Sequence, residues 1–349
     1  MTLQAGDLLA ITRPTGPEAG TYQLTGAALA ELLNPPPVLG ISGVVWSTVR
    51  SAADNSWQAI CWSPELQIYV CVAGSGTGNR VMTSGDGIRW SPQPSAADQN
   101  WVALCWAAEL GLFVAVSDSG IGNRVMTSAD GRSWTLRQTP ANNNWTAICW
   151  SPELGLLVAV SSTGTGNRVM TSPDGLTWKA GPAAADQDWR SLCWAPQLDL
   201  FLAVSSTGGS QRVMTSSDGR NWTLRTAAAA NSWTAICWAA ELGLLVAVSS
   251  SGRGNRVMTS LDGISWSSRS SAADNAWTSI CWAPERELLV AVSSSGTGNR
   301  IMTSVDGFNW TVRSSPADLG WRSLCWSPQR RQFAAVSNSG AGNRMMVSP

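Results

Sequence analysis

The stretch "WTAICWSPELGLLVAVSSTGTGNRVMTSPDGLTWKAG" occupies residues 145–181 and carries the signals of four short β-strands. The segment "WTAICWS" mixes aromatic and β-branched residues, and the nearly continuous apolar run "LLVAVSS" follows the turn "PELG". The polar loop "STGTG" leads to "NRVMTS", and the turn "PDGL" leads to "TWKAG". Short strands separated by turn residues are typical of antiparallel sheets. The apolar run further predicts a strand that is covered on both faces.

This pattern recurs every 44 residues, and tryptophan marks it most clearly. Three series of seven account for all 21 Trp residues: Trp57, Trp101, Trp145, Trp189, Trp233, Trp277 and Trp321; Trp62, Trp106, Trp150, Trp194, Trp238, Trp282 and Trp326; Trp46, Trp90, Trp134, Trp178, Trp222, Trp266 and Trp310. Residues 42–349 hold seven such repeats without insertions. Four strands in a fixed period in the low forties are typical of propeller blades. We therefore expect an all-β fold, a seven-bladed β-propeller of four-stranded blades.

The seventh repeat ends at "NRMMVSP" and has no fourth strand of its own. The segment "ISGVVWSTVR" (41–50) carries Trp46, which lies 44 residues before Trp90, together with a fourth-strand pattern. Pairing of this segment with the strand around Arg344, Met345 and Met346 would close the ring and remove two exposed sheet edges. We expect the N-terminal strand to complete the last blade.

The repeated Trp and Cys residues are expected to be structural. A buried Trp contributes a large apolar surface between blades, and the alternative is that some Trp residues are stacking platforms for sugar rings. Seven of the eight Cys residues precede the second Trp of each repeat, and Cys71 is the eighth. Equivalent positions on different blades lie too far apart for disulfides, so we expect small buried thiols. No Cys-x-x-Cys metal spacing occurs, and we expect no metal and no cofactor.

The composition excludes several functional classes. Lys and Arg balance Asp and Glu at 23 each, so the basic surface typical of nucleic-acid binding is absent. There is no His, the commonest general base and transition-metal ligand. No apolar run is long enough to span a membrane, and the N-terminus has no standard secretory signal pattern. We expect no nucleic-acid partner and no membrane insertion.

An Asp-Gly turn precedes the third Trp of each complete repeat, as in "TSADGRSW" (127–134) and "TSPDGLTW" (171–178). These segments resemble the Asp-box of sialidase-like propellers, with one residue fewer between Asp and Gly. The resemblance implies a structural turn between the third and fourth strands, with Asp accepting backbone N–H groups and Gly taking a positive φ. The expected turn formers are Asp86, Asp130, Asp174, Asp218, Asp262 and Asp306.

Sialidase chemistry is not expected from this resemblance. Those enzymes use three Arg residues, a Tyr nucleophile with a Glu partner, and an Asp acid, whereas Tyr22 and Tyr69 are the only Tyr residues here. The recurring Glu residues, such as Glu109 and Glu153, fall in the "PELG"-type turns at the opposite end of the blade. No pair of carboxylates stands out from the repeat, as glycoside hydrolysis would need. We expect no catalytic residues.

One face of the predicted propeller gathers polar loops. The loop between the second and third strands ("SSTGTGNR") and the connection to the next blade ("AADNSW") should emerge together. Each Arg there is expected either to pair with an Asp or a loop carbonyl and brace adjacent blades, or to form one of several repeated polar pockets for a sugar. The candidate ligand-binding residues are Asn79, Arg80, Asn123, Arg124, Asn167, Arg168, Gln211, Arg212, Asn255, Arg256, Asn299, Arg300, Asn343 and Arg344. The clearest departures from the repeat are residues 208–212, Asp118, Arg253 and residues 329–332.

Residues 1–34 lie outside the repeat. We expect two short strands, "DLLAITRP" and "GTYQLTG", then a brief helix, "AALAELL", followed by a Pro-rich linker at 35–40 and the propeller at 41–349. The first segment resembles a short module near the N-termini of virion structural proteins of tailed phages. The matching residues include Asp7, Leu8, Leu9, Arg13, Tyr22 and Leu24. The repeats are also similar to those of phage tail and appendage proteins, cyanophages among them.

These resemblances imply a virion structural protein, either a tail fibre or spike or a head appendage, assembled in the host cytoplasm. Residues 1–34 would dock on other tail or capsid proteins, with the chain as a homotrimer in one arrangement. The propeller would bind a host-surface receptor, and a glycan is the expected class. The alternatives are a free-standing multivalent lectin and a structural virion decoration that binds no ligand.

Overall fold

The computed structural model describes residues 8–12, 21–25 and 42–349, and the chain divides into two compact units, residues 1–41 and 42–349. In the first unit, β1 (Leu8–Thr12) pairs antiparallel with β2 (Thr21–Thr25). The register places Leu9 opposite Leu24 and Ile11 opposite Tyr22. The brief helix and the Pro-rich linker expected from the sequence lie outside the described residues, as do Asp7 and Arg13.

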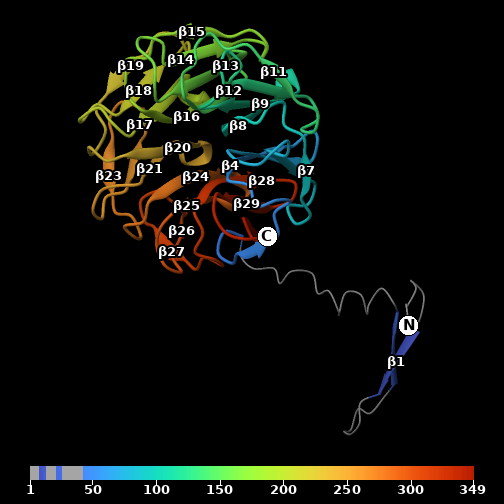
Figure 1. Ribbon diagram of the computed structural model, residues 1–349. Coiled ribbons are helices and arrows are strands. Elements are labelled where there is room, and N and C mark those ends of the chain that lie inside the picture. The colour runs from blue at the N-terminus through green and yellow to red at the C-terminus, as the bar shows by residue number, and fades with distance from the viewer. Residues whose placement is uncertain (1–7, 13–20, 26–41) are drawn as a thin grey trace. The chain divides into compact units, whose positions relative to one another are not determined.

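Residues 42–349 form seven four-stranded antiparallel sheets, which confirms the predicted seven-bladed propeller. Figure 1 shows the sheets side by side around a common centre. The first strands lie nearest that centre: β4 (Trp57–Ser63), β8 (Trp101–Ala107), β12 (Trp145–Ser151), β16 (Trp189–Ala195), β20 (Trp233–Ala239), β24 (Trp277–Ala283) and β28 (Trp321–Ser327). Each has a β-bulge directly after its first Trp, for example between Trp189 and Ser191 in β16.

The second strands are the buried layer of each blade. They are β5 (Ile68–Ala73), β9 (Leu112–Ser117), β13 (Leu156–Ser161), β17 (Leu200–Ser205), β21 (Leu244–Ser249), β25 (Leu288–Ser293) and β29 (Gln332–Ser337). Every residue of β13, β21 and β25 is buried, as the continuous apolar runs predict. Four short 3-10 helices, which the sequence did not predict, precede β9, β17, β21 and β25: Ala108–Leu110, Pro196–Leu198, Ala240–Leu242 and Pro284–Arg286.

The outer half of each blade is formed by the third and fourth strands. The third strands are β6 (Val81–Ser84), β10 (Val125–Ser128), β14 (Val169–Ser172), β18 (Val213–Ser216), β22 (Val257–Ser260), β26 (Ile301–Ser304) and β30 (Met345–Ser348). The fourth strands, at the rim in Figure 1, are β7 (Ser91–Gln93), β11 (Thr135–Arg137), β15 (Lys179–Gly181), β19 (Thr223–Arg225), β23 (Ser267–Arg269), β27 (Thr311–Arg313) and β3 (Ser47–Val49).

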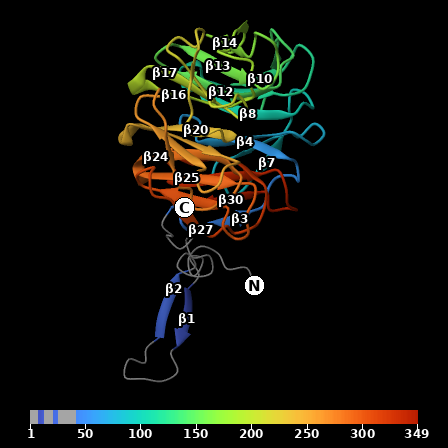
Figure 2. The same cartoon turned by 90° about the vertical axis from the view of Figure 1, so that its left-hand side faces the viewer.

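The last blade is completed from the N-terminal side, as predicted. Strand β3 pairs antiparallel with β30, with Thr48 opposite Met346 and Val49 opposite Met345, and Figure 2 shows the two strands alongside each other. The interrupted Asp-Gly turn is also rebuilt across the two segments. The backbone N–H of Gly43 donates to the Ser348 hydroxyl oxygen at 2.7 Å, where Gly87 donates to Ser84 at 2.8 Å in the first blade.

The cores lie between neighbouring blades. The first-series Trp residues are fully buried, and each packs on the second strand of the preceding blade; Trp101, for instance, lies in one cluster with Val70 and Val72. All eight Cys residues are free thiols. Cys71 and Cys193 are buried as expected, whereas the other six were expected to be buried but are half-buried. No helix among the described residues is long and apolar enough to cross a membrane.

Candidate binding face

The loops between second and third strands and the connections to the next blade share one face, as the sequence predicts. In all but one of the seven blades, a backbone N–H of the loop donates to an Asp or Asn of the following connection, such as Gly78 to Asp98 at 2.8 Å. The exception is the fourth blade, where Ala230 occupies the equivalent position. We call the surface formed by these loops and connections the loop face.

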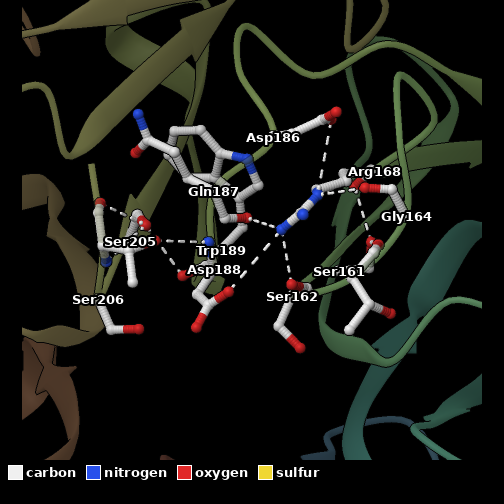
Figure 3. Close-up of polar contacts among 12 residues, drawn as sticks. Ser161, Ser162, Gly164, Arg168, Asp186, Gln187, Asp188, Trp189, Ser205 and Ser206 are labelled. Carbon is white, nitrogen blue, oxygen red and sulfur yellow. Dashed lines mark hydrogen bonds and ion pairs between the residues drawn. The ribbon is translucent and has the colours of Figure 1, made fainter.

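Each repeated Arg of the loop face braces two blades. In Arg168, Nε donates to the Gly164 carbonyl at 2.8 Å, and Nη1 donates to the carbonyls of Ser162 at 2.6 Å and Gln187 at 2.7 Å. Because Gln187 belongs to the connection into the next blade, these bonds join the two blades. Asp186 lies 3.6 Å from Nε, as Figure 3 shows. The guanidinium is therefore largely used within the protein.

A carbonyl of the next connection is also bonded by Arg124, Arg212, Arg300 and Arg344. Arg80 and Arg256 reach the next connection instead through ion pairs with Asp98 at 3.6 Å and Asp274 at 3.5 Å. Arg344 donates to the Asn55 carbonyl at 2.9 Å and so fastens the last blade to the first. Burial lowers the pKa of Arg124 and Arg212. A direct contact of these arginines with a ligand stays a prediction.

The repeated Asn residues are held within their own blades. The side chain of Asn55 donates to the carbonyl and to the side-chain oxygen of Asn79, at 2.8 and 3.1 Å. Asn167, Asn255 and Asn299 receive the same pair of bonds, and Asn123 is contacted by Gln99. In the last blade Leu319 replaces the donor, and the side-chain oxygen of Asn343 is buried without a partner among the described residues. Gln211 is exposed.

The opposite face carries the Asp-Gly turns, and their geometry is that of turn formers. The Oδ1 atom of Asp306 accepts the backbone N–H groups of Phe308 and Asn309, both at 2.8 Å, and the Ser304 hydroxyl at 2.9 Å. Equivalent bonds are made by Asp86, Asp130, Asp174, Asp218 and Asp262. Burial acts to raise the pKa of Asp306, but these hydrogen bonds outweigh it and lower the pKa to about 2.

A ring of hydrogen bonds on this side, from Trp indole N–H groups to Glu or Gln side chains, was not foreseen from the sequence. The indole N–H of Trp106 donates to Glu65 of the preceding blade at 2.6 Å, and Trp194 donates to Glu153 at 2.6 Å. Trp150, Trp282 and Trp326 likewise donate to Glu residues of the preceding blade. Trp238 and Trp62 donate instead to the side-chain oxygens of Gln197 and Gln329. The Glu residues of the "PELG"-type turns are thus interblade contacts.

The axis of the propeller contains a cavity of about 700 Å³. It is lined by the first strands and by residues of the loop face, including Asp118 and Ser206. The inserted residue of several bulges lines it, among them Gln58, Arg190 and Arg322. A bulge re-aims a side chain relative to a regular strand. Arg253, also singled out in the sequence, lies instead at an exposed loop tip.

Sequence reasoning missed this cavity and its two arginines. The Nε atom of Arg190 donates to the Ser206 hydroxyl at 3.1 Å, and Nη2 lies 3.5 Å from Asp188. The Nε atom of Arg322 donates to the Gln58 side chain at 3.2 Å. The available signal was the position after the first Trp, which is Thr in three repeats and Arg in two. No group of three or more Cys, Asp or Glu that would hold a metal occurs within the described part of the chain.

No protein-family model and no curated protein matches the chain. Among solved structures, the β-propeller domain of Myceliophteria thermophila Cps50 (Swd1) aligns with a TM-score of 0.63 and 12% identity. The alignment covers 88% of this chain and 99% of that domain. The likeness is one of fold. At this identity it supports the β-propeller architecture and says nothing about a ligand or a partner.

Proposed function

We propose that this chain is a non-enzymatic virion structural protein of a tailed phage, and that its propeller binds a glycan on the host surface. The observation that carries the binding proposal is the loop face, on which seven similar polar loops surround the 700 Å³ cavity. The virion proposal rests on the resemblance of the N-terminal segment and of the repeats to phage virion proteins.

The bracing of the loop face favours binding over a merely solvated surface. Arg168 and four of its equivalents hold their loops to the next blade through backbone carbonyls, and Arg80 and Arg256 do so through Asp98 and Asp274. Little conformational entropy therefore remains to be lost when a ligand binds. Loop-tip residues such as Thr77, Thr165 and Thr297 stay exposed around the ring. Repeated weak sites on one rigid disc gain affinity through multivalency, which suits a polysaccharide on a cell surface.

The glycan proposal is tested on a broad glycan array with the propeller, residues 42–349. We expect retention of one saccharide class, and we expect the same saccharide to inhibit adsorption of the phage. A silent array together with unaltered adsorption would refute the glycan proposal and would leave a structural decoration.

The virion proposal is tested by deleting residues 1–34. We expect the remaining protein to keep the circular dichroism and thermal midpoint of the full chain, because the deletion leaves the described strands of residues 42–349 in place. The truncated protein should be missing from purified particles, whereas the full-length chain should be present in particles assembled with it. Incorporation of both forms would refute the docking role, and absence of both would indicate a free-standing lectin.

A further inference from the structure

The axial cavity departs from the sevenfold repeat in its charge. The inserted bulge residue is Thr in the third, fifth and sixth blades, and these hydroxyls are used internally; that of Thr146, for example, donates to the Trp189 carbonyl at 2.6 Å. In the fourth and seventh blades the same position holds Arg190 and Arg322. Two cations therefore face a space to which three other blades contribute hydroxyl groups that already donate within the protein.

The hydrogen-bonding capacity of Arg322 is only partly used. Its Nε atom bonds Gln58, whereas Nη1 and Nη2 make no hydrogen bond or ion pair with any described residue. Arg190 is better satisfied, through Ser206 and through Asp188, whose carboxylate is 3.5 Å away. The side chain of Arg322 is exposed to solvent in the cavity. Partial desolvation by the surrounding protein, and then the positive charge of Arg190, lower the pKa of Arg322. Both arginines line the same cavity, and an anion bound there would offset their positive charges.

The carboxylates near the cavity do not neutralise both arginines. Asp118 lines the cavity but forms no ion pair with either Arg190 or Arg322. Asp188 pairs with Arg190 and also lies 3.8 Å from Arg168 of the loop-face brace. Arg322 is therefore the cation of the cavity that lacks a carboxylate partner among the described residues.

We propose that the axial cavity binds the oxyanion group, carboxylate or sulfate, of an acidic saccharide, with Arg322 as its main anchor. This inference rests on the proposed glycan binding and names the chemical class of the ligand. The planar fork of Nη1 and Nη2 matches two oxygens of a carboxylate or sulfate. Arg190 contributes a second positive charge, and Gln58 orients Arg322 through its Nε atom.

The size and lining of the cavity suit a saccharide. Its volume of about 700 Å³ falls within the usual range for small-molecule sites. Besides the arginines it is lined by hydroxyl groups, including those of Ser206, Thr207 and Ser232, which are suited to sugar hydroxyls. Because these residues lie at the loop face, the chain of a polysaccharide can continue outwards over the loops.

The experiment is isothermal titration of the full chain with four probes. These are an oligogalacturonide, an oligosaccharide of a sulfated galactan, a neutral galacto-oligosaccharide and inorganic sulfate. We expect one or both acidic oligosaccharides to bind, and binding should weaken as salt is raised. The first two probes distinguish a carboxylate from a sulfate as the group recognised. Inorganic sulfate should compete weakly with whichever oligosaccharide binds.

Three variants make the test specific to Arg322. Arg322→Gln should weaken binding about 10- to 100-fold, as expected for loss of a hydrogen-bonded charge. The affinity of Arg322→Lys should lie between those of the wild type and Arg322→Gln. Arg132→Gln removes the same charge from an exposed Asp-Gly turn on the opposite face and should bind like the wild type. Thermal midpoints equal to the wild type show that the variants are folded; if Arg322→Gln unfolds, Arg322→Lys carries the test.

The outcomes separate this inference from the proposed function. Equal binding by wild type and Arg322→Gln, or an equal loss in Arg132→Gln, would overturn the role of Arg322. Binding of the neutral probe alone would leave glycan binding standing and refute the acidic class. A protein that binds none of these probes, and retains nothing on the glycan array, would refute both.

Discussion

Removal of the closing strand tests how the ring is held together. Two proteins are compared, residues 42–349 and residues 51–349, which differ by β3 and the segment before it. The shorter one loses Trp46, whose side chain is 7% exposed and packs on Phe333 with ring centroids 6.1 Å apart. It also loses the pairing of β3 with β30 and the bond from Gly43 to Ser348.

The size of the effect follows from these contacts. Burial of a Trp side chain, roughly 200 Å² at about 25 cal/mol per Å², corresponds to about 5 kcal/mol as an upper estimate. Each hydrogen bond lost with the strand adds about 1 kcal/mol. A loss of 5 kcal/mol is already comparable to the whole stability of many domains. With an unfolding entropy of about 2.1 cal/mol/K per residue, it lowers the midpoint of a propeller of this size by about 8 °C.

The assay is differential scanning calorimetry of the two proteins in the same buffer. We expect the midpoint of residues 51–349 to lie about 8 °C or more below that of residues 42–349. Hydrogen exchange should also accelerate in β30, because its outer edge becomes exposed to solvent. Midpoints within about 2 °C of each other, with unchanged exchange in β30, would refute the view that β3 holds the ring closed.

Three further predictions concern the turns and the thiols. The lowered pKa of Asp306, about 2, means that its stabilising contribution is complete above pH ~5 and is lost as the pH falls from ~4 to ~2. Asp306→Ala should therefore cost about 1–2 kcal/mol near neutral pH and less at pH 2.5 by urea unfolding, and a cost independent of pH would contradict this. Glu287 (φ 47°) and Gly243 (φ 56°) occupy equivalent left-handed (αL) positions, which favour glycine. Glu287→Gly should therefore leave the free energy of unfolding unchanged or raise it by up to about 1 kcal/mol, whereas Gly243→Ala should lower it. Changes of the same sign for both variants in thermal unfolding would refute the view that the left-handed backbone favours glycine here. Burial raises the pKa of Cys71 and Cys193 well above its usual value, so these two thiols should react with an aromatic disulfide reagent at pH 8 only after unfolding. Labelling of all eight thiols in the native protein would contradict their burial.

The blade count and the ring closure were predictable from the sequence because each depends on a period. The 44-residue spacing fixed seven units, and the distance from Trp46 to Trp90 identified the missing fourth strand. For Arg168 the sequence left two interpretations open, bracing of adjacent blades or part of a polar pocket for a sugar. The sequence alone does not show whether a guanidinium group bonds a carbonyl or faces solvent. Its contacts with Ser162 and Gln187 are visible only in the folded structure.

The features that could not be predicted depend on how blades meet. Glu65 and Trp106 lie 41 residues apart in adjacent units, and only the placement of the blades brings them to 2.6 Å. Arg190 and Arg322 are single departures from the repeat, and their position at the cavity depends on a bulge that no spacing of apolar residues indicates. Repeat patterns reveal what the blades share, whereas these arginines are where two blades differ from the rest.

The most direct test of the proposed binding function is hydrogen–deuterium exchange of the propeller, residues 42–349, with and without the saccharide that the glycan array retains. We expect protection in the second-to-third loops, such as residues 162–168, and in the first strands that line the axial cavity. The Asp-Gly turns of the opposite face, such as residues 304–310, should exchange as in the free protein. Protection confined to those turns, or no protection at saturating saccharide, would contradict the assignment of the loop face as the binding surface.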